Sequence, residues 1–119
     1  MAINENLQNL VISPEFGENG LNAAKGSVDS FLLTANTAKT ITVPTFTNAA
    51  GSQTPAKKCI LAFDNNIWVN WGTTATIPSS DTTDGTGSEL NPSARTLSGV
   101  TSFSVISSTA AKGSITWYR

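Results

Sequence analysis

The sequence predicts an all-β protein: an antiparallel β-sandwich of jelly-roll-like type, or a small barrel, with about eight short strands. Short apolar runs recur at roughly ten-residue spacing and are separated by Gly, Pro, Asn and Asp, which favour turns. No segment with helical periodicity is long enough to predict a stable helix. The composition agrees, because only 39% of the residues are hydrophobic and 13% are charged, and Thr, Ser, Asn and Gly make up the difference.

The 119 residues divide into an N-terminal arm, residues 1–26, and a sandwich domain, residues 27–119. The arm scatters apolar side chains among polar ones: Leu7, Leu10, Val11, Ile12, Phe16 and Leu21. An extended arm, or a short helix followed by a loop, fits this pattern and needs a surface to lie on. That surface is either its own domain or another subunit, and in the second case Leu7, Leu10 and Phe16 are candidate interface residues.

The first predicted strands are residues 28–33 and 39–43, and we expect them to form a hairpin. Alternation places Ile41 and Val43 on the inward face of the second strand. The next segment, residues 45–55, is small and polar without periodicity, which predicts an exposed loop.

The apolar mass is densest in residues 57–77, where two apolar runs are separated by Asp-Asn-Asn. Short apolar runs bounded by turn residues predict a central hairpin with its turn at residues 64–66. Alternation divides the second run between two faces and points Trp68 outward. The inward positions of this run are Ile67, Val69 and Trp71.

The rest of the chain continues the strand pattern. A short strand is predicted at residues 73–77, a polar loop at 79–89 and a brief return to the core at 90–92. Three more strands are predicted, at residues 95–98, 101–107 and 113–119. Their inward side chains are Phe103, Val105, Ile115 and Trp117.

Trp68 and Tyr118 are the candidate outward aromatic residues, because each alternates with an inward neighbour. An outward aromatic residue on a sheet is covered by the arm, buried against a neighbouring subunit, or exposed as a platform for a ligand. The sequence leaves these three interpretations open.

The sequence carries no catalytic motif. It contains no histidine, which removes Ser-His and Cys-His arrangements and the commonest metal ligand. We therefore expect neither an enzyme nor a cofactor. Asp81, Asp84 and Glu89 either offer oxygen ligands to Ca²⁺ or form ordinary turns. Cys59 lies in an apolar run, which predicts a buried side chain, and a chain without a disulfide framework fits a reducing cytoplasm.

Charge and hydropathy exclude two classes of partner. The formal net charge is −1, so we expect no basic face for nucleic acid. The chain has neither the basic and apolar regions of a signal peptide nor an apolar run of about 20 residues, so we expect no membrane partner.

Two stretches carry a resemblance to a known class of protein. The first runs from Trp68 through W-V-N-W-G-T-T-A-T-I-P to Asp81, G-T-G-S-E-L-N-P and Arg95. The second is the closing pattern S-V-I-S followed by G-S-I-T-W-Y. Together they resemble small virion proteins of tailed bacteriophages over about residues 57–119.

The resemblance implies a structural role. Members that cement capsids are all-β oligomers, often trimers, placed where capsomers meet. The expected partner is therefore the phage major capsid protein, the expected assembly is a homo-oligomer with a trimer favoured, and the expected location is the outer surface of a virion assembled in the host cytoplasm. Two alternatives remain open: another virion component, such as a head fibre, collar or tail-attached module, and a carbohydrate-binding module that stacks a sugar on Trp68 or Tyr118.

Overall fold

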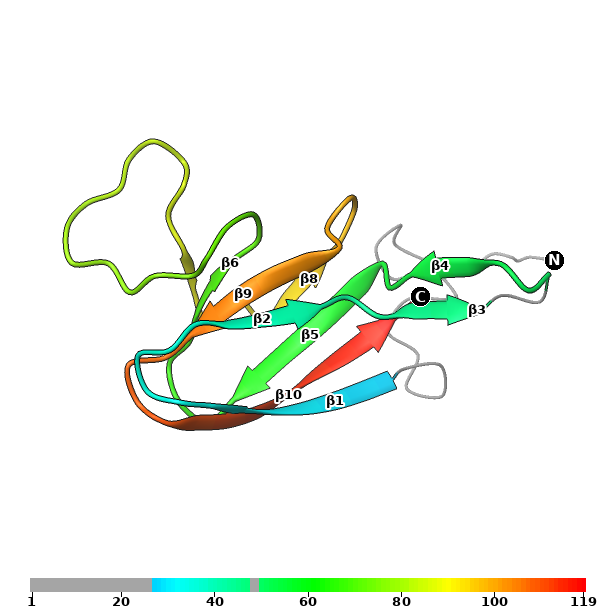
Figure 1. The fold of residues 1–119 in the computed structure, drawn as a ribbon, viewed down its shortest axis with the longest axis horizontal. Helices are drawn as coiled ribbons and strands as arrows, with labels where there is room; N and C mark the ends of the chain where they lie inside the picture. The colour runs from blue at the N-terminus through cyan, green and yellow to red at the C-terminus, as the bar shows by residue number, and fades with distance from the viewer. Residues whose placement is uncertain (1–26, 48–49) are drawn as a thin grey trace, which may run out of the picture.

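The computed structural model describes residues 27–47 and 50–119, and in this part the chain is all-β, as predicted. It forms ten strands, shown in Figure 1. The strands are β1 (Ser27–Leu33), β2 (Lys39–Thr42), β3 (Thr45–Thr47), β4 (Gln53–Pro55), β5 (Lys58–Phe63), β6 (Trp68–Asn70), β7 (Glu89–Leu90), β8 (Ala94–Thr96), β9 (Ser102–Ile106) and β10 (Ala111–Tyr118).

Eight of these strands make two four-stranded antiparallel sheets, with the orders β1-β10-β5-β8 and β2-β9-β6-β7. The remaining two, β3 and β4, form a separate hairpin that projects from one end of the sandwich (Figure 1). Along the eight sheet strands the chain changes sheet at every step except from β6 to β7. This is the strand order of a jelly roll, so the sandwich and not the barrel describes the fold.

Both predicted hairpins are wrong, because each pair of strands is divided between the two sheets. β1 pairs with β10 while β2 pairs with β9, and β5 pairs with β10 while β6 pairs with β9. The residues expected to close the central turn bind distant backbone instead. Asp64 Oδ1 accepts a hydrogen bond from Lys112 N at 2.8 Å, and Asn65 Nδ2 donates to Ala110 O at 2.8 Å. Residues 64–66 are therefore a crossover between sheets.

The predicted loop at residues 45–55 is also wrong, since it contains the hairpin of β3 and β4. Polar side chains stabilise this pairing where no apolar pattern exists. Thr45 Oγ1 donates to Gln53 Oε1 at 2.7 Å, and Gln53 Nε2 donates to Thr47 Oγ1 at 2.9 Å. Such a cross-strand polar pair leaves no hydrophobic periodicity for a sequence pattern to detect.

The segment after β6 differs from its prediction in two further ways. Residues 73–77 form no strand, because Ala75 N donates to the Ser104 side-chain oxygen at 2.9 Å and not to a ladder. Leu90 does not return to the core, since 47% of its surface is exposed, whereas Pro92 in the same predicted stretch is buried.

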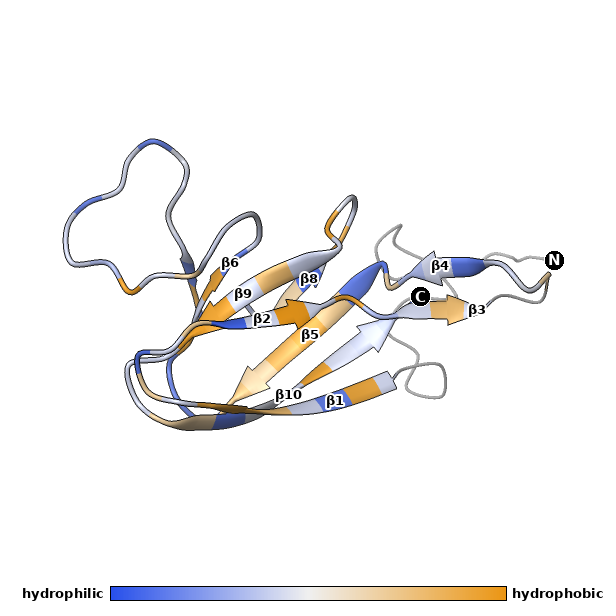
Figure 2. Cartoon of the chain, viewed as in Figure 1, coloured by the Kyte–Doolittle hydropathy of each residue, from blue (hydrophilic) through white to orange (hydrophobic). Residues whose placement is uncertain are grey.

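The core lies between the two sheets, whose strands carry most of the apolar residues (Figure 2). The inward predictions on the regular strands are confirmed, because all of these residues are buried: Ile41, Val43, Ile67, Val69, Phe103, Val105, Ile115 and Trp117. Trp71 is partly buried against the core, with its ring centroid 4.7 Å from that of Phe103. The Phe103 ring is in turn 6.0 Å from that of Trp117, so aromatic contacts join the two sheets.

Candidate interaction surfaces

The predicted interface residues have different outcomes. Leu7, Leu10 and Phe16 lie outside the described residues. Trp68 alternates with the fully buried Val69 and is half-buried on the outer face of its sheet, as expected. Tyr118 is buried, with 7% of its surface exposed, so of the three interpretations left open for it the exposed ligand platform is the one that does not fit.

Tyr118 lies at the end of β10, where other segments of the chain meet this strand. Lys57 N donates to Tyr118 O at 2.8 Å, which holds the last strand residue in the sheet. The hairpin of β3 and β4 also reaches this end, where the Arg119 guanidinium lies 5.6 Å from the centre of the Phe46 ring. Alternation assigns a residue to a face of the sheet, but it does not say whether other segments crowd that end of the face.

Trp68 lies in an apolar row that crosses three strands. It is directly opposite Leu90 of β7 and directly opposite Ile106 of β9. Residues opposite one another on neighbouring strands share a face of the sheet, so the three side chains line up on the outer side. We call this surface the Trp68 row (Trp68, Leu90 and Ile106). Its most exposed member is Leu90.

The long loop between β6 and β7 covers the polar part of the same outer face. Asn70 Oδ1 accepts hydrogen bonds from Gly72 N at 3.0 Å and Thr73 N at 2.8 Å, and Asn70 Nδ2 donates to Thr86 O at 3.2 Å. Asn70 and Ser104 are therefore buried with hydrogen-bond partners from the loop. This anchoring leaves the Trp68 row beside the loop as the apolar part of the face that remains partly open.

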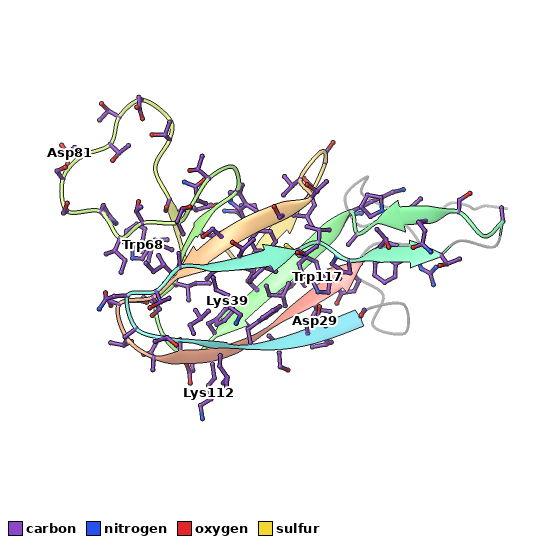
Figure 3. All side chains as sticks on the ribbon, in the orientation of Figure 1. Asp29, Lys39, Trp68, Asp81, Lys112 and Trp117 are labelled. Atoms are coloured by element: carbon purple, nitrogen blue, oxygen red, sulfur yellow. The ribbon has the colours of Figure 1, made fainter. Side chains whose placement is uncertain are left out.

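The acidic residues of this loop behave as turn and surface groups. Asp84 Oδ1 accepts hydrogen bonds from Thr86 Oγ1 at 2.6 Å and from Thr86 N at 3.1 Å, and these bonds lower the Asp84 pKa. Figure 3 places Asp81 at the far end of the loop, away from the strands. Within the described ranges, no group of three or more His, Cys, Asp or Glu side chains is placed to hold a metal ion. The Ca²⁺ alternative therefore has no support.

Glu89 connects the loop to the edge of the sandwich. It forms an ion pair with Arg95, whose hydrogen bond lowers the Glu89 pKa, and it accepts a hydrogen bond from Trp71 Nε1 at 3.0 Å. The pair is exposed on both sides, so it contributes little to stability. Its effect is to orient the Trp71 ring, which borders the core.

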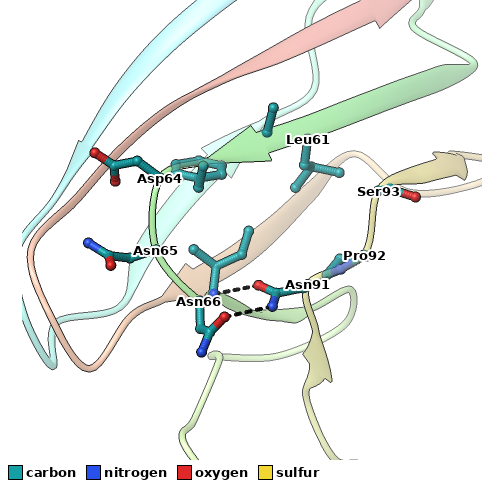
Figure 4. A pocket seen from close by; sticks show the side chains of 10 residues that line it. Leu61, Asp64, Asn65, Asn66, Asn91, Pro92 and Ser93 are labelled. Carbon is teal, nitrogen blue, oxygen red and sulfur yellow. Dashed lines mark hydrogen bonds between the residues drawn. The ribbon is translucent and has the colours of Figure 1, made fainter.

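A pocket of about 290 Å³ lies where the 64–66 crossover meets the segment after β7 (Figure 4). Asn91 adopts a left-handed backbone conformation with φ of 49°. Its Oδ1 accepts from Ile67 N at 2.8 Å and its Nδ2 donates to Asn66 Oδ1 at 2.9 Å. The Asn91 side chain is thus used to fix the crossover. No sequence signal pairs Asn66 with Asn91, because the contact joins two separate loops.

Cys59 is buried, as predicted, and burial raises the pKa of its thiol to about 11. At pH 8 we expect the native thiol to react with a disulfide reagent about a hundredfold more slowly than an ordinary cysteine, since the thiolate is the nucleophile. Because the folded pKa is above the unfolded one, Cys59 should also lower the free energy of unfolding as the pH rises from about 9 to about 11. Thiol titration with and without urea measures the first effect.

A second thiol at the exposed Ser98 is the matched control for this measurement. In the Ser98→Cys variant, one thiol should react at the ordinary rate and the other only after unfolding. Two equally fast thiols in the native protein would contradict the burial of Cys59.

Comparisons with known proteins find no match: no family model fits the chain, and neither the curated proteins nor the solved structures contain a significant relative. Among the residues that the structure describes, no helix is long and apolar enough to cross a membrane.

Proposed function

We propose that this protein is a non-enzymatic virion structural protein of a tailed bacteriophage, which decorates and stabilises the capsid by binding the major capsid protein. The resemblance over residues 57–119 suggests the class. The observation that carries the binding role is the Trp68 row, an apolar strip on the outer face of its sheet in which Trp68 and Leu90 are partly open. Tryptophan is the residue type most enriched at the energetic centres of protein interfaces.

The row fits a partner that offers an apolar patch and no strong charge. Trp68 is half-buried and therefore loses little side-chain freedom when a partner covers it, and Ile106 beside it is already buried, with 9% of its surface exposed. Leu90 adds exposed apolar area at the rim. Each copy needs only modest affinity, because an oligomer attached at several points on a capsid gains avidity. The low net charge of the chain agrees with binding by shape and apolar contact.

The other virion positions, namely head fibre, collar or tail-attached module, remain alternatives that differ from decoration in copy number. A carbohydrate-binding role retains only Trp68 as a platform, because Tyr118 is buried. No contact in the described residues favours that role over a protein partner.

The test is binding of the full chain to heads of the encoding phage that lack this protein. The wild-type protein should co-sediment with the heads at a copy number comparable to that of the major capsid protein, whereas a ring at one vertex would give about a dozen copies. Trp68→Ala and Leu90→Lys should each weaken binding at least tenfold, because both alter the Trp68 row.

The matched control is Ala62→Lys, which introduces the same charge at an exposed position of the other sheet. It should bind heads as the wild type does. If Trp68→Ala and Leu90→Lys also bind normally, the Trp68 row is not the capsid contact.

A further inference from the structure

The longest open edge in the described part of the fold is β1. It has seven residues, whereas the other three sheet edges, β2, β7 and β8, have four, two and three. β1 pairs with β10 on one side, and no described strand pairs with it on the other (Figure 1). An open edge presents backbone N–H and C=O groups that can pair with another extended chain.

The outer side chains of β1 do not protect this edge. On its outer face Val28 is 61% exposed and Leu32 is 70% exposed, and the residue between them is Ser30. Natural edge strands usually carry charges, proline or a bulge that prevent pairing, and the outer face of β1 has no charge and no proline. The one charged residue, Asp29, accepts a hydrogen bond from Trp117 Nε1 at 2.9 Å and so is directed into its own sandwich (Figure 3).

We infer that β1 pairs antiparallel with β1 of a second copy of this chain, about a two-fold axis at Ser30. In this pairing each residue lies opposite the residue of the second copy that is equally far from Ser30 in the other direction. Val28 of each copy therefore lies opposite Leu32 of the other copy. The two most exposed large apolar side chains of the described chain thereby cover each other on one face. The pairing joins two four-stranded sheets into one continuous sheet.

Strand lengths select this pairing over a head-to-tail one. A closed ring, such as a trimer, would need β1 of one copy to pair with a different edge of the next copy. The other sheet edges, β8, β2 and β7, have three, four and two residues, so none of them can cover more than four of the seven residues of β1. Self-pairing uses all seven residues of β1. It also places Ser27 of one copy and Ser27 of the other, each of which follows a 26-residue segment, at opposite ends of the paired strands.

This inference deepens the proposed function and rests on it for its biological role, because it names the surface through which the expected homo-oligomer forms. It assigns a dimer as the pairing unit, in place of the trimer that the resemblance favours. The Trp68 row lies on the other sheet, so self-pairing through β1 leaves it free for the capsid.

The decisive experiment is cross-linking of the full chain carrying Ser30→Cys. At the two-fold axis the two introduced cysteines face each other directly, within reach of a disulfide after a small adjustment. Mild oxidation should convert most chains into disulfide-linked dimers on a non-reducing gel. The native Cys59 does not compete, because it is buried.

The matched control is Ser114→Cys, since Ser114 is the register partner of Ser30 on β10 and shares its face one strand further from the axis. Cross-linking there should be at least tenfold slower. Equal cross-linking rates at the two positions, or no cross-linking of Ser30→Cys, would overturn the pairing. The second result is the one expected if residues 1–26 of the same chain cover β1.

Sedimentation of the unmodified protein gives the second readout. We expect a dimer, and Leu32→Lys should raise the dissociation constant of that dimer at least tenfold, while Leu90→Lys on the other sheet should leave it unchanged. A monomer at all concentrations, or a trimer, would contradict the inference. Binding to phage heads separates the β1 pairing from the capsid role. A monomer that binds heads refutes only the pairing, and a dimer that does not bind heads refutes only the capsid role.

Discussion

Replacing Trp117 with alanine should lower the free energy of unfolding by about 3–5 kcal/mol. The Trp117 side chain is fully buried, it contacts Phe103 across the sandwich, and it pairs in register between Ser27 and Cys59. Removing it leaves a large cavity that neighbouring strands cannot fill without breaking their ladders. A domain of this size has roughly 5–15 kcal/mol of stability, so the melting temperature should fall by about 15 °C or more.

Urea unfolding followed by circular dichroism measures this loss at a fixed protein concentration, because an oligomer's stability depends on concentration. Trp68→Ala removes the same side chain from a half-buried outward position and is the matched control. It should cost about 1 kcal/mol, since little core volume changes. Equal losses in the two variants would mean that Trp117 is not the centre of the core.

The side-chain pattern was sufficient for the fold class and for most of the core. Residues 39–43, 101–105 and 113–117 alternate, and a two-residue period fixes which side chains face inward whatever the strand pairs with. The buried positions of Ile41, Phe103 and Ile115 follow from this period alone.

Strand pairing could not be predicted in the same way. A period of two says which face is buried but not which sheet the strand joins, and a jelly roll sends nearly every consecutive strand to the opposite sheet. The Asp-Asn-Asn stretch at 64–66 has the composition of a tight turn, yet its side chains bind the backbone of residues 110 and 112. Turn propensity is local, whereas those contacts exist only in the folded chain.

The candidate surface was predicted in part. Alternation placed Trp68 outward, but Leu90 was expected in the core, so the row they form could not be anticipated. Its third member, Ile106, comes directly after the inward residue Val105, so alternation places it on the outer face of that strand. Only the pairing of β6 with both β7 and β9 brings the three together.

Gly113→Ala should destabilise the protein by about 1–3 kcal/mol, although general strand preference predicts the opposite sign. Glycine inside a strand costs roughly 0.5–1 kcal/mol relative to alanine, so an unobstructed substitution would stabilise. Here a Cβ atom on Gly113 would lie 2.4 Å from the Ala62 carbonyl oxygen and 2.4 Å from the Phe63 ring. Gly113 pairs in register with Phe63, whose ring covers the space that a side chain would occupy.

The clash makes Gly113→Ala destabilising, because one of the two close contacts of the added Cβ atom cannot be relieved by a small movement. The Phe63 ring can shift, but the Ala62 carbonyl belongs to β5 and moves only if the β5–β10 ladder distorts. Chemical unfolding of Gly113→Ala should therefore show a loss that Phe63→Leu in the same chain relieves only in part. Gly72→Ala is the control, because its Cβ would meet only Asn70 Oδ1, at 4.0 Å, and it should be neutral or slightly stabilising. If Gly113→Ala matched Gly72→Ala, the close contact of Phe63 and β5 with Gly113 would be refuted.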